Sequence, residues 1–519
     1  MEAKPHTLRN LAILLALWEV GGRLRLIAGG ALPSLSAIFV KLWADRADYP
    51  NHVWATLEAS GLGFVIGNVV AILAGILFVL SPRALRLARG FNIAIFALPP
   101  IVIAPILALV LQGMTPRVTL AAIGVYFVTM SATVVGLSQY DRRAADVVLA
   151  YGGGPGKVLR LVQMRGAVPA ILSGFRVAAP NAVLGAILAE FGGGGRWGLG
   201  AYLLGSLGRA DPPRLWGIGL VATAIAGLSY AVFATLSVRM LGASRAITLN
   251  PAPPAGPPVA EPLALRLATA AASVALPFVI WWGVLKLLSA PEMIAKTPWA
   301  VVTYLFLSDA SPLAREKLFS ALSETLPITG IGLISGLAFA FVLAVSGRLF
   351  PNLTRAFLPV ALVTQTMPLV ALTPLLVLML GRGTGLTLWV TISVTFFPAY
   401  VMLAQGLAQV PQSAMDLPRA YGASAWRELR LVSIPASMPW LFAATRLTVP
   451  RALLGVMIAE WLATGKGLGN LLNQSRGYLD FGMIWSVAAT TVILSVIFYQ
   501  VVLMFERRVL VRMGMTPSE

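Results

Sequence analysis

Apolar stretches of the length of a membrane-spanning helix recur along the chain, separated by short polar or basic segments. A helix needs roughly 20 mainly apolar residues to cross a bilayer, so the pattern predicts about twelve spans, six in each half. The expected spans are Leu11–Gly30, Leu57–Leu80, Phe91–Leu111, Val118–Ser138, Pro169–Phe191, Leu215–Val238, Leu263–Leu288, Leu322–Ser346, Phe357–Leu380, Leu386–Gln405, Pro439–Leu462 and Gly482–Phe505. The predicted fold class is therefore an all-α polytopic membrane protein with two six-helix halves.

Composition supports lipid as the solvent of this chain. Of its 519 residues, 58% are hydrophobic and 11% are charged, whereas soluble domains carry about 25% charged residues. The net charge of +19 comes from basic clusters between the apolar stretches. Clusters of this kind mark cytoplasmic loops, so they indicate membrane topology rather than nucleic-acid binding. They place both termini inside, and the expected location is the bacterial inner membrane.

The two halves repeat one another at nearly constant spacing. The matching segments are Thr56-Leu57 with Thr325-Leu326, Gly61/Gly63/Gly67 with Gly330/Gly332/Gly336, Ala150-Tyr151-Gly152 with Ala420-Tyr421-Gly422, Arg176 with Arg446, and Ala189-Glu190 with Ala459-Glu460. An even number of spans per half predicts a parallel repeat about an axis along the membrane normal. The expected domains are residues 1–246, a proline-rich cytoplasmic linker at 247–262, and residues 263–519.

A long polar segment separates the fourth and fifth spans of each half, at residues 139–168 and 406–438. Each predicts two short helices on either side of a glycine, Gly152 or Gly422, which permits a sharp backbone turn. We expect a cytoplasmic knuckle in each half. The alternative is a solvated connector, which the recurrence of the Ala-Tyr-Gly core disfavours.

These segments resemble the EAA motif of ABC importer permeases, the inner-membrane components of binding-protein-dependent transport. The matching positions are Asp146, Ala150, Tyr151 and Gly152 in the first copy and Asp416, Ala420, Tyr421, Gly422 and Pro435 in the second. The first copy departs from the motif at Arg165, where the second has Pro435. With the Ala-Glu and Gly-Leu-Gly sequences that follow, the chain looks most like a fused, tandem form of the nitrate, sulfonate and taurine branch.

The resemblance implies a transport component without catalytic residues of its own. Two cytoplasmic ATPase subunits would receive the two knuckles, and ATP and magnesium would bind to those subunits. An extracytoplasmic binding protein would deliver a small, often anionic solute. Gly152–Lys157 looks like a phosphate-binding loop but has Val158 where Ser or Thr must reach magnesium. No cofactor is therefore expected on this chain.

Prolines and glutamates at matching positions are candidates for the pathway or its gate. Pro99 and Pro105 in the first half, and Pro368 and Pro374 in the second, interrupt the third span, which predicts a bent, pore-lining helix or else a packing kink. Glu190 and Glu460 lie at the outer ends of the fifth spans. Ionisable residues at such depth often mark a pathway, although they can also cap or pair locally.

Two other functions compete with the importer. A secondary transporter driven by an ion gradient also has six-plus-six parallel halves, but it needs coupling charges in mid-membrane, which are scarce here, and lacks the duplicated knuckle. A membrane enzyme needs a nucleophile or metal site. The chain has no cysteine and its two histidines have no metal-ligand spacing, so the importer is favoured.

Overall fold

The structure, a computed structural model, describes residues 5–26, 30–193, 195–209, 211–241, 262–350, 373, 376–377 and 379–515. Helices account for almost all of these residues. In the first half they are α1 (Pro5–Arg23), α2 (Leu35–Ala44), α3 (Tyr49–Leu80), α4 (Pro82–Ala97), α5 (Pro100–Val110), α6 (Thr115–Ser138), α7 (Arg142–Ala150), α8 (Pro155–Val158), α9 (Met164–Phe191), α10 (Leu199–Ser206) and α11 (Pro212–Leu241). In the second half they are α12 (Leu263–Leu287), α13 (Pro298–Val302), α14 (Ser311–Leu349), α17 (Thr384–Ala408), α18 (Gln412–Ala420), α19 (Ala425–Glu428), α20 (Ile434–Ala436), α21 (Met438–Ala459), α22 (Gly467–Gly477) and α23 (Phe481–Arg512).

The described part of the chain confirms the all-α membrane fold. It contains nine helices long and apolar enough to span a bilayer, and α4 with α5 makes a tenth, bent by 98°. Of the two remaining predicted spans, the first corresponds to α1, which ends at Arg23 rather than at Gly30 as predicted. The other, Phe357–Leu380, lies almost entirely outside the described residues.

Small residues let the spans of each half approach closely. A Cβ on Gly63 or Gly67 of α3 would collide with α6, and one on Gly332 or Gly336 of α14 would collide with α17. Lipid offers no hydrophobic driving force between helices, so close backbone approach supplies the packing energy instead. Four of the six glycines that repeat between the halves therefore lie at close helix contacts, whereas Gly61 and Gly330 face open space.

The two halves interlock rather than sit side by side. Helix α12 of the second half packs along α4 of the first, where the Gly90 N–H donates to Ser273 Oγ over 2.8 Å. One hydrophobic core contains residues of both halves, among them Ile101 on α5 and Met457 on α21. The two repeats therefore form a single body.

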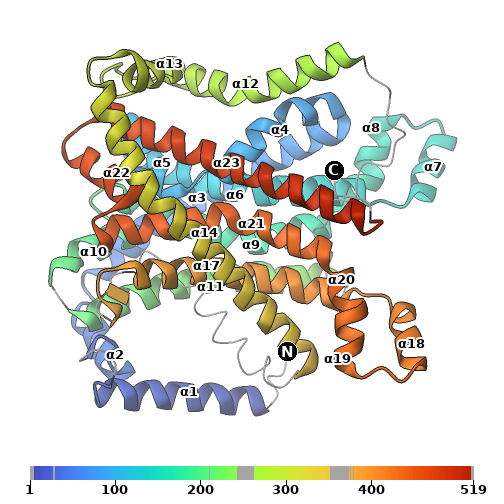
Figure 1. Ribbon diagram of the computed structural model, residues 1–519, viewed down its shortest axis with the longest axis horizontal. Coiled ribbons are helices and arrows are strands. Elements are labelled where there is room, and N and C mark those ends of the chain that lie inside the picture. The colour runs from blue at the N-terminus through green and yellow to red at the C-terminus, as the bar shows by residue number, and fades with distance from the viewer. Residues whose placement is uncertain are drawn as a thin grey trace.

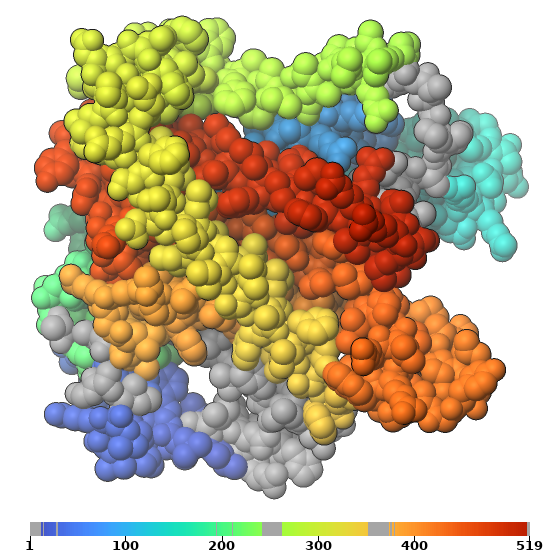
Figure 2. Space-filling model, in the orientation of Figure 1, coloured from blue at the N-terminus to red at the C-terminus, as the bar shows by residue number. Residues whose placement is uncertain are grey.

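The long axis of the molecule separates two functional ends (Figure 1). Helices α7 and α8 project at the same end of the molecule as α18 and α19, and in the space-filling view the two pairs form separate protrusions beyond the body (Figure 2). We call this the loop end. Helices α10 and α22 lie at the opposite end, which we call the clamp end.

Candidate functional site

The first projecting loop, residues 139–163, is a helical hairpin turned by Gly152. Asp141 caps α7 by accepting the Arg143 N–H over 2.9 Å. At the other end of α7, the Gly152 N–H donates to the Leu149 carbonyl and the Gly153 N–H to the Val148 carbonyl, over 3.0 and 2.8 Å. This pair of bonds ends a helix with a residue in the left-handed region, and Gly152 has φ +74°. The glycine therefore fixes the reversal into α8.

The second projecting loop, residues 409–437, has the same backbone. The Gly422 N–H donates to the Arg419 carbonyl and the Ala423 N–H to the Pro418 carbonyl, over 2.9 and 3.0 Å. Gly422 has φ +72°. The predicted order of helix, glycine and helix is therefore confirmed in both copies, and α18 and α7 present equivalent faces.

Each loop exposes an aromatic side chain at its tip. Tyr151 is 89% exposed and Tyr421 is 86% exposed. The first loop also exposes Val147, and the second exposes Leu417 at the equivalent position. Large apolar side chains exposed together on a soluble segment are typical of protein interaction surfaces.

The two loops differ in the contact that joins their paired helices. In the second loop Arg419 forms an ion pair with Glu428 over 3.0 Å. The repeat spacing that relates Gly152 to Gly422 places Leu149 and Val158 at these two positions of the first loop. The first loop therefore has two apolar residues at the positions where the second has an ion pair.

The connection from each loop to the fifth span also differs. Each loop contains a π-helical turn after its second short helix, at Leu159–Gln163 and at Leu429–Ser433. In the first half α9 then runs unbroken from Met164 to Phe191, with Pro169 and Pro180 inside it. In the second half the helix breaks at Ser437 between α20 and α21. The break lies between Pro435 and Pro439. Pro439 matches Pro169, but Pro435 has no counterpart in the first half, where Arg165 stands, so the additional proline accompanies the break in the helix.

At the clamp end, Glu190 is buried in a closed hydrogen-bond network. The Thr56 hydroxyl donates to Glu190 Oε1 over 2.8 Å and accepts the Leu199 N–H over 2.9 Å. The Gly200 N–H donates to Glu190 Oε2 over 2.8 Å. We call these three bonds the first Thr-Glu clamp, because they join α3, α9 and the start of α10.

A second Thr-Glu clamp repeats the first. The Thr325 hydroxyl donates to Glu460 Oε1 over 2.8 Å and accepts the Leu468 N–H over 2.9 Å, while the Gly469 N–H donates to Glu460 Oε2 over 2.9 Å. Gly198 and Gly467, with φ +142° and +81°, leave no room for a side chain, since a Cβ on either would collide with the glutamate. The Gly-Leu-Gly sequences are therefore explained by the carboxylate that they enclose.

The candidate residues thus fall into two separate groups. Those of the projecting loops, from Asp146 to Gly152 and from Asp416 to Pro435, gather at the loop end, and the two glutamates lie at the clamp end. The third span of the first half breaks at Leu98–Pro99, before Pro100, whereas Pro105 lies inside α5. Pro368 and Pro374 lie outside the described residues. The roles of the prolines and glutamates in a pathway or gate stay predictions.

The threonines of the clamps were missed as site residues from the sequence alone. Their signal was present in the repeat, since Thr56-Leu57 and Thr325-Leu326 match. A duplicated polar residue inside an apolar span indicates a partner of its own, and here that partner is the glutamate at the end of the fifth span.

Comparison with known proteins identifies the class. The family described as binding-protein-dependent transport system inner membrane component matches twice, over residues 67–246 and 331–511. The chain belongs to this family, and its two copies show that it is a tandem permease. It is a transport component of the ABC type.

Individual relatives agree with this class. A probable ABC transporter permease protein of Haemophilus influenzae is 27% identical over 235 residues, which are 45% of this chain and 94% of the relative. The riboflavin permease protein RibX of Chloroflexus aurantiacus is 30% identical, over 30% of this chain and 58% of its own length. The formylaminopyrimidine permease protein ThiX of Halalkalibacterium halodurans is 27% identical, over 39% of this chain and 78% of its own length. Permeases named for aliphatic sulfonates and for nitrate match at 23 and 24% identity, in line with the predicted branch.

Proposed function

We propose that this chain forms the whole translocation pathway of an ATP-driven importer for a small anionic solute, in the bacterial inner membrane. Each projecting loop docks one cytoplasmic ATPase subunit, and a binding protein outside the membrane delivers the solute to the clamp end. The observation that carries the proposal is the pair of matching hairpins, each turned by a left-handed glycine and tipped by an exposed tyrosine. ATP and magnesium bind to the partner subunits.

Two loops in one chain match two ATPase subunits. The family model matches two units of this chain, and each matched unit contains one of the projecting loops. The exposed tyrosine and apolar side chains of each loop supply a docking surface. The backbone bonds at Gly152 and Gly422 fix the turn of each hairpin, so the hairpin resists bending when a partner pushes on it. Because the loops face the cytoplasm in this proposal, the clamp end faces outward.

The clamps give the pathway a stiff outer rim. Each fixes the backbone that follows the fifth span to the second span of the same half, through a carboxylate with both oxygens bonded. Movement of a loop at one end of α9 or α21 is therefore carried to the other end rather than absorbed at the turn. The anionic character of the solute is supported by relatives named for sulfonates and nitrate.

Purification of the full chain from its own cell, with the co-purifying ATPase and its ATP hydrolysis measured, tests this function. Gly152→Val and Gly422→Val force a β-branched residue into the left-handed region, which costs about 1–3 kcal/mol and distorts the hairpin. We expect each variant to lose ATPase. Gly113→Val and Gly381→Val are matched controls, because both glycines have left-handed φ and open space around them but lie outside the loops.

The proposal is wrong if the Gly152→Val and Gly422→Val double variant retains the ATPase and full transport. Uptake of solute by the purified chain with an ion gradient alone would instead support the secondary transporter.

A further inference from the structure

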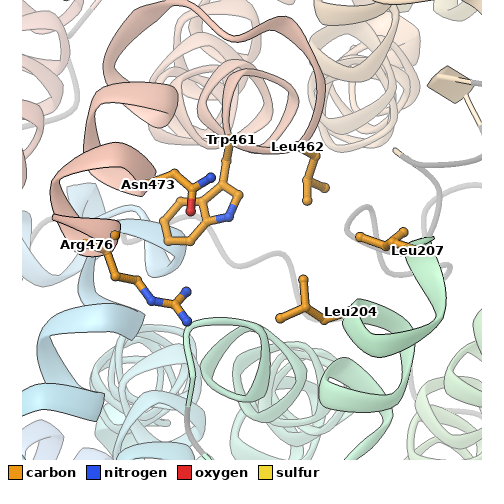
Figure 3. A pocket seen from close by; sticks show the side chains of 7 residues that line it. Leu204, Leu207, Trp461, Leu462, Asn473 and Arg476 are labelled. Carbon is orange, nitrogen blue, oxygen red and sulfur yellow. The ribbon is translucent and has the colours of Figure 1, made fainter.

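An open cavity of about 430 Å³ lies between the two halves at the clamp end. Its first-half wall is Leu204 on α10 and Leu207 just after it; its second-half wall is Trp461, Leu462, Asn473, Arg476 and Gly477 (Figure 3). The volume suits a small organic molecule. Residues from both repeats line the cavity. A solute that passes between the two halves would therefore enter through it.

The two walls have different chemistry although they come from equivalent segments. Leu207 and Arg476 are related by the spacing of 269 residues that relates Gly198 to Gly467, and so are Leu204 and Asn473. The first half presents aliphatic side chains, while the second presents a guanidinium, a carboxamide and an indole. The cavity is therefore apolar on one side and cationic on the other.

The charge of Arg476 is not neutralised within the described part of the chain, where no carboxylate forms an ion pair with it. Its guanidinium lies over the Trp461 ring at 5.9 Å, and Trp461 itself is buried. Burial lowers the pKa of Arg476, which reflects loss of water without a compensating negative group. An arginine stays protonated in proteins nonetheless, so the cavity offers an unused positive charge beside an aromatic face.

A second arginine, Arg451, lies deeper, on the helix α21 that leads to Trp461. Arg451 precedes Leu454 and Ile458 at helical spacing on α21, about 10 Å along the helix from Ile458 at 1.5 Å per residue. Trp461 follows in the π-helical turn Glu460–Thr464. Leu454, Ile458 and Trp461 pack in the core shared with α5, so this face is turned toward the first half. Arg451 is half-buried, and among the described residues no carboxylate pairs with it. Residues 351–380 contain no Asp or Glu either.

The first half has Asn181 at the position equivalent to Arg451. A charge inside a spanning helix is costly and marks a pathway when it faces the interior of a bundle. From the cavity inward, the seam between the halves thus offers Arg476 and then Arg451, both from the second half.

We propose that this cavity binds an organic anion with one charged group and an apolar body, of the alkyl- or arylsulfonate or carboxylate class. Its charged group lies against Arg476 and Asn473, and its apolar body lies against Leu204 and Leu207. A small inorganic anion would leave the aliphatic wall without contact. The proposal rests on the proposed function, because it assumes that solute enters between the halves at this end.

The test is binding of hexanesulfonate to the purified full chain in lipid nanodiscs, measured by calorimetry without ATPase. Methanesulfonate, nitrate and hexyltrimethylammonium are the comparison ligands. We expect saturable binding of hexanesulfonate that is about tenfold or more weaker in Arg476→Gln, as loss of one charged contact predicts, and largely kept in Arg476→Lys. Leu207→Ser should reduce the preference for hexanesulfonate over methanesulfonate.

Arg196→Gln is the matched control, because Arg196 also lies over a tryptophan, Trp197, at 5.1 Å, but outside the cavity. Equal binding of hexanesulfonate by Arg476→Gln and Arg196→Gln overturns the proposal, as does nitrate binding as tightly as hexanesulfonate or tight binding of the cation. Each variant is also checked for bound ATPase. A variant that loses hexanesulfonate binding but keeps its ATPase has lost the cavity and not the coupling to the ATPase. Failure of the unaltered chain to bind an ATPase would contradict the proposed function and not the cavity.

Discussion

Gly152 and Gly422 end the first helices of the two projecting loops with the same pair of backbone bonds, whereas the side chains beside them differ. Leu149 and Val158 stand in the first loop where Arg419 and Glu428 form an ion pair in the second. The same contrast recurs at the cavity, with leucines from the first half and Arg476 from the second. The clamps, by comparison, agree bond for bond.

The comparison separates two kinds of position in a duplicated chain. At the turn of each loop and at each clamp, the bonds of the two halves are alike. At the surfaces that we propose meet other molecules, the two halves differ. A fused chain can hold two different surfaces in a fixed arrangement, which two copies of one identical subunit cannot do.

The largest difference in stability is expected at Arg176 and Arg446, which occupy equivalent positions. Arg446 pairs with Glu506, which is 2% exposed, while Arg176 donates to the Tyr230 hydroxyl over 2.8 Å. Glu506→Leu leaves the half-buried Arg446 guanidinium without the Glu506 carboxylate and should cost about 3–5 kcal/mol. Tyr230→Phe should cost about 0.5–1.5 kcal/mol.

Unfolding of the purified variants in detergent, followed by circular dichroism, measures both changes. An equal loss of unfolding free energy in Glu506→Leu and Tyr230→Phe would contradict the difference between the Arg446 ion pair and the Arg176 hydrogen bond.

The two clamps should give equal effects of intermediate size. Thr56→Val and Thr325→Val each remove a hydroxyl that serves as donor to a glutamate and as acceptor for a backbone N–H, so each should cost about 1–3 kcal/mol. Thr491→Val is the control, since the Thr491 hydroxyl is buried but donates only to the Val487 carbonyl of its own helix. Stability measured by the same unfolding assay should fall in both clamp variants and change little in the control. A loss in only one clamp variant would break the equivalence of the halves at this end.

The smallest effect is expected at the ion pair of the second projecting loop. Glu428→Val gives this loop the residue that the first loop has at Val158. Arg419 is 43% exposed, and pairs exposed to water contribute about 0–1 kcal/mol. We expect nearly unchanged unfolding and a measurable shift in ATPase affinity for that loop. A loss of stability as large as that of the clamp variants would show that the pair holds the loop together rather than shaping its surface.

The sequence predicted the spans, the repeat and the loops because each leaves a local signal. Twenty apolar residues, a shared Ala-Tyr-Gly and a glycine between two polar helices are visible without knowing what lies nearby. Even so, α1 ends earlier than predicted, at Arg23, where basic residues and glycines interrupt the apolar pattern.

What could not be predicted depends on contacts between distant segments. Glu190 appeared as a gate candidate or a local cap, and only its contact with Thr56 shows a bonded carboxylate. Arg451 was overlooked because a single arginine does not change the apolar character of its span. The cavity at Trp461 and Arg476 arises where two repeats meet, so neither repeat alone contains it.

Which side of the membrane each loop faces tests the central claim most directly. The chain has no cysteine, so Tyr151→Cys and Tyr421→Cys each introduce a single exposed thiol for a membrane-impermeant maleimide. The account predicts labelling in inverted vesicles stripped of ATPase, protection when the ATPase is bound, and no labelling in intact spheroplasts. Gln112→Cys, an exposed position between α5 and α6, should show the reverse sidedness. Labelling of the two loop thiols from outside the cell would contradict the account.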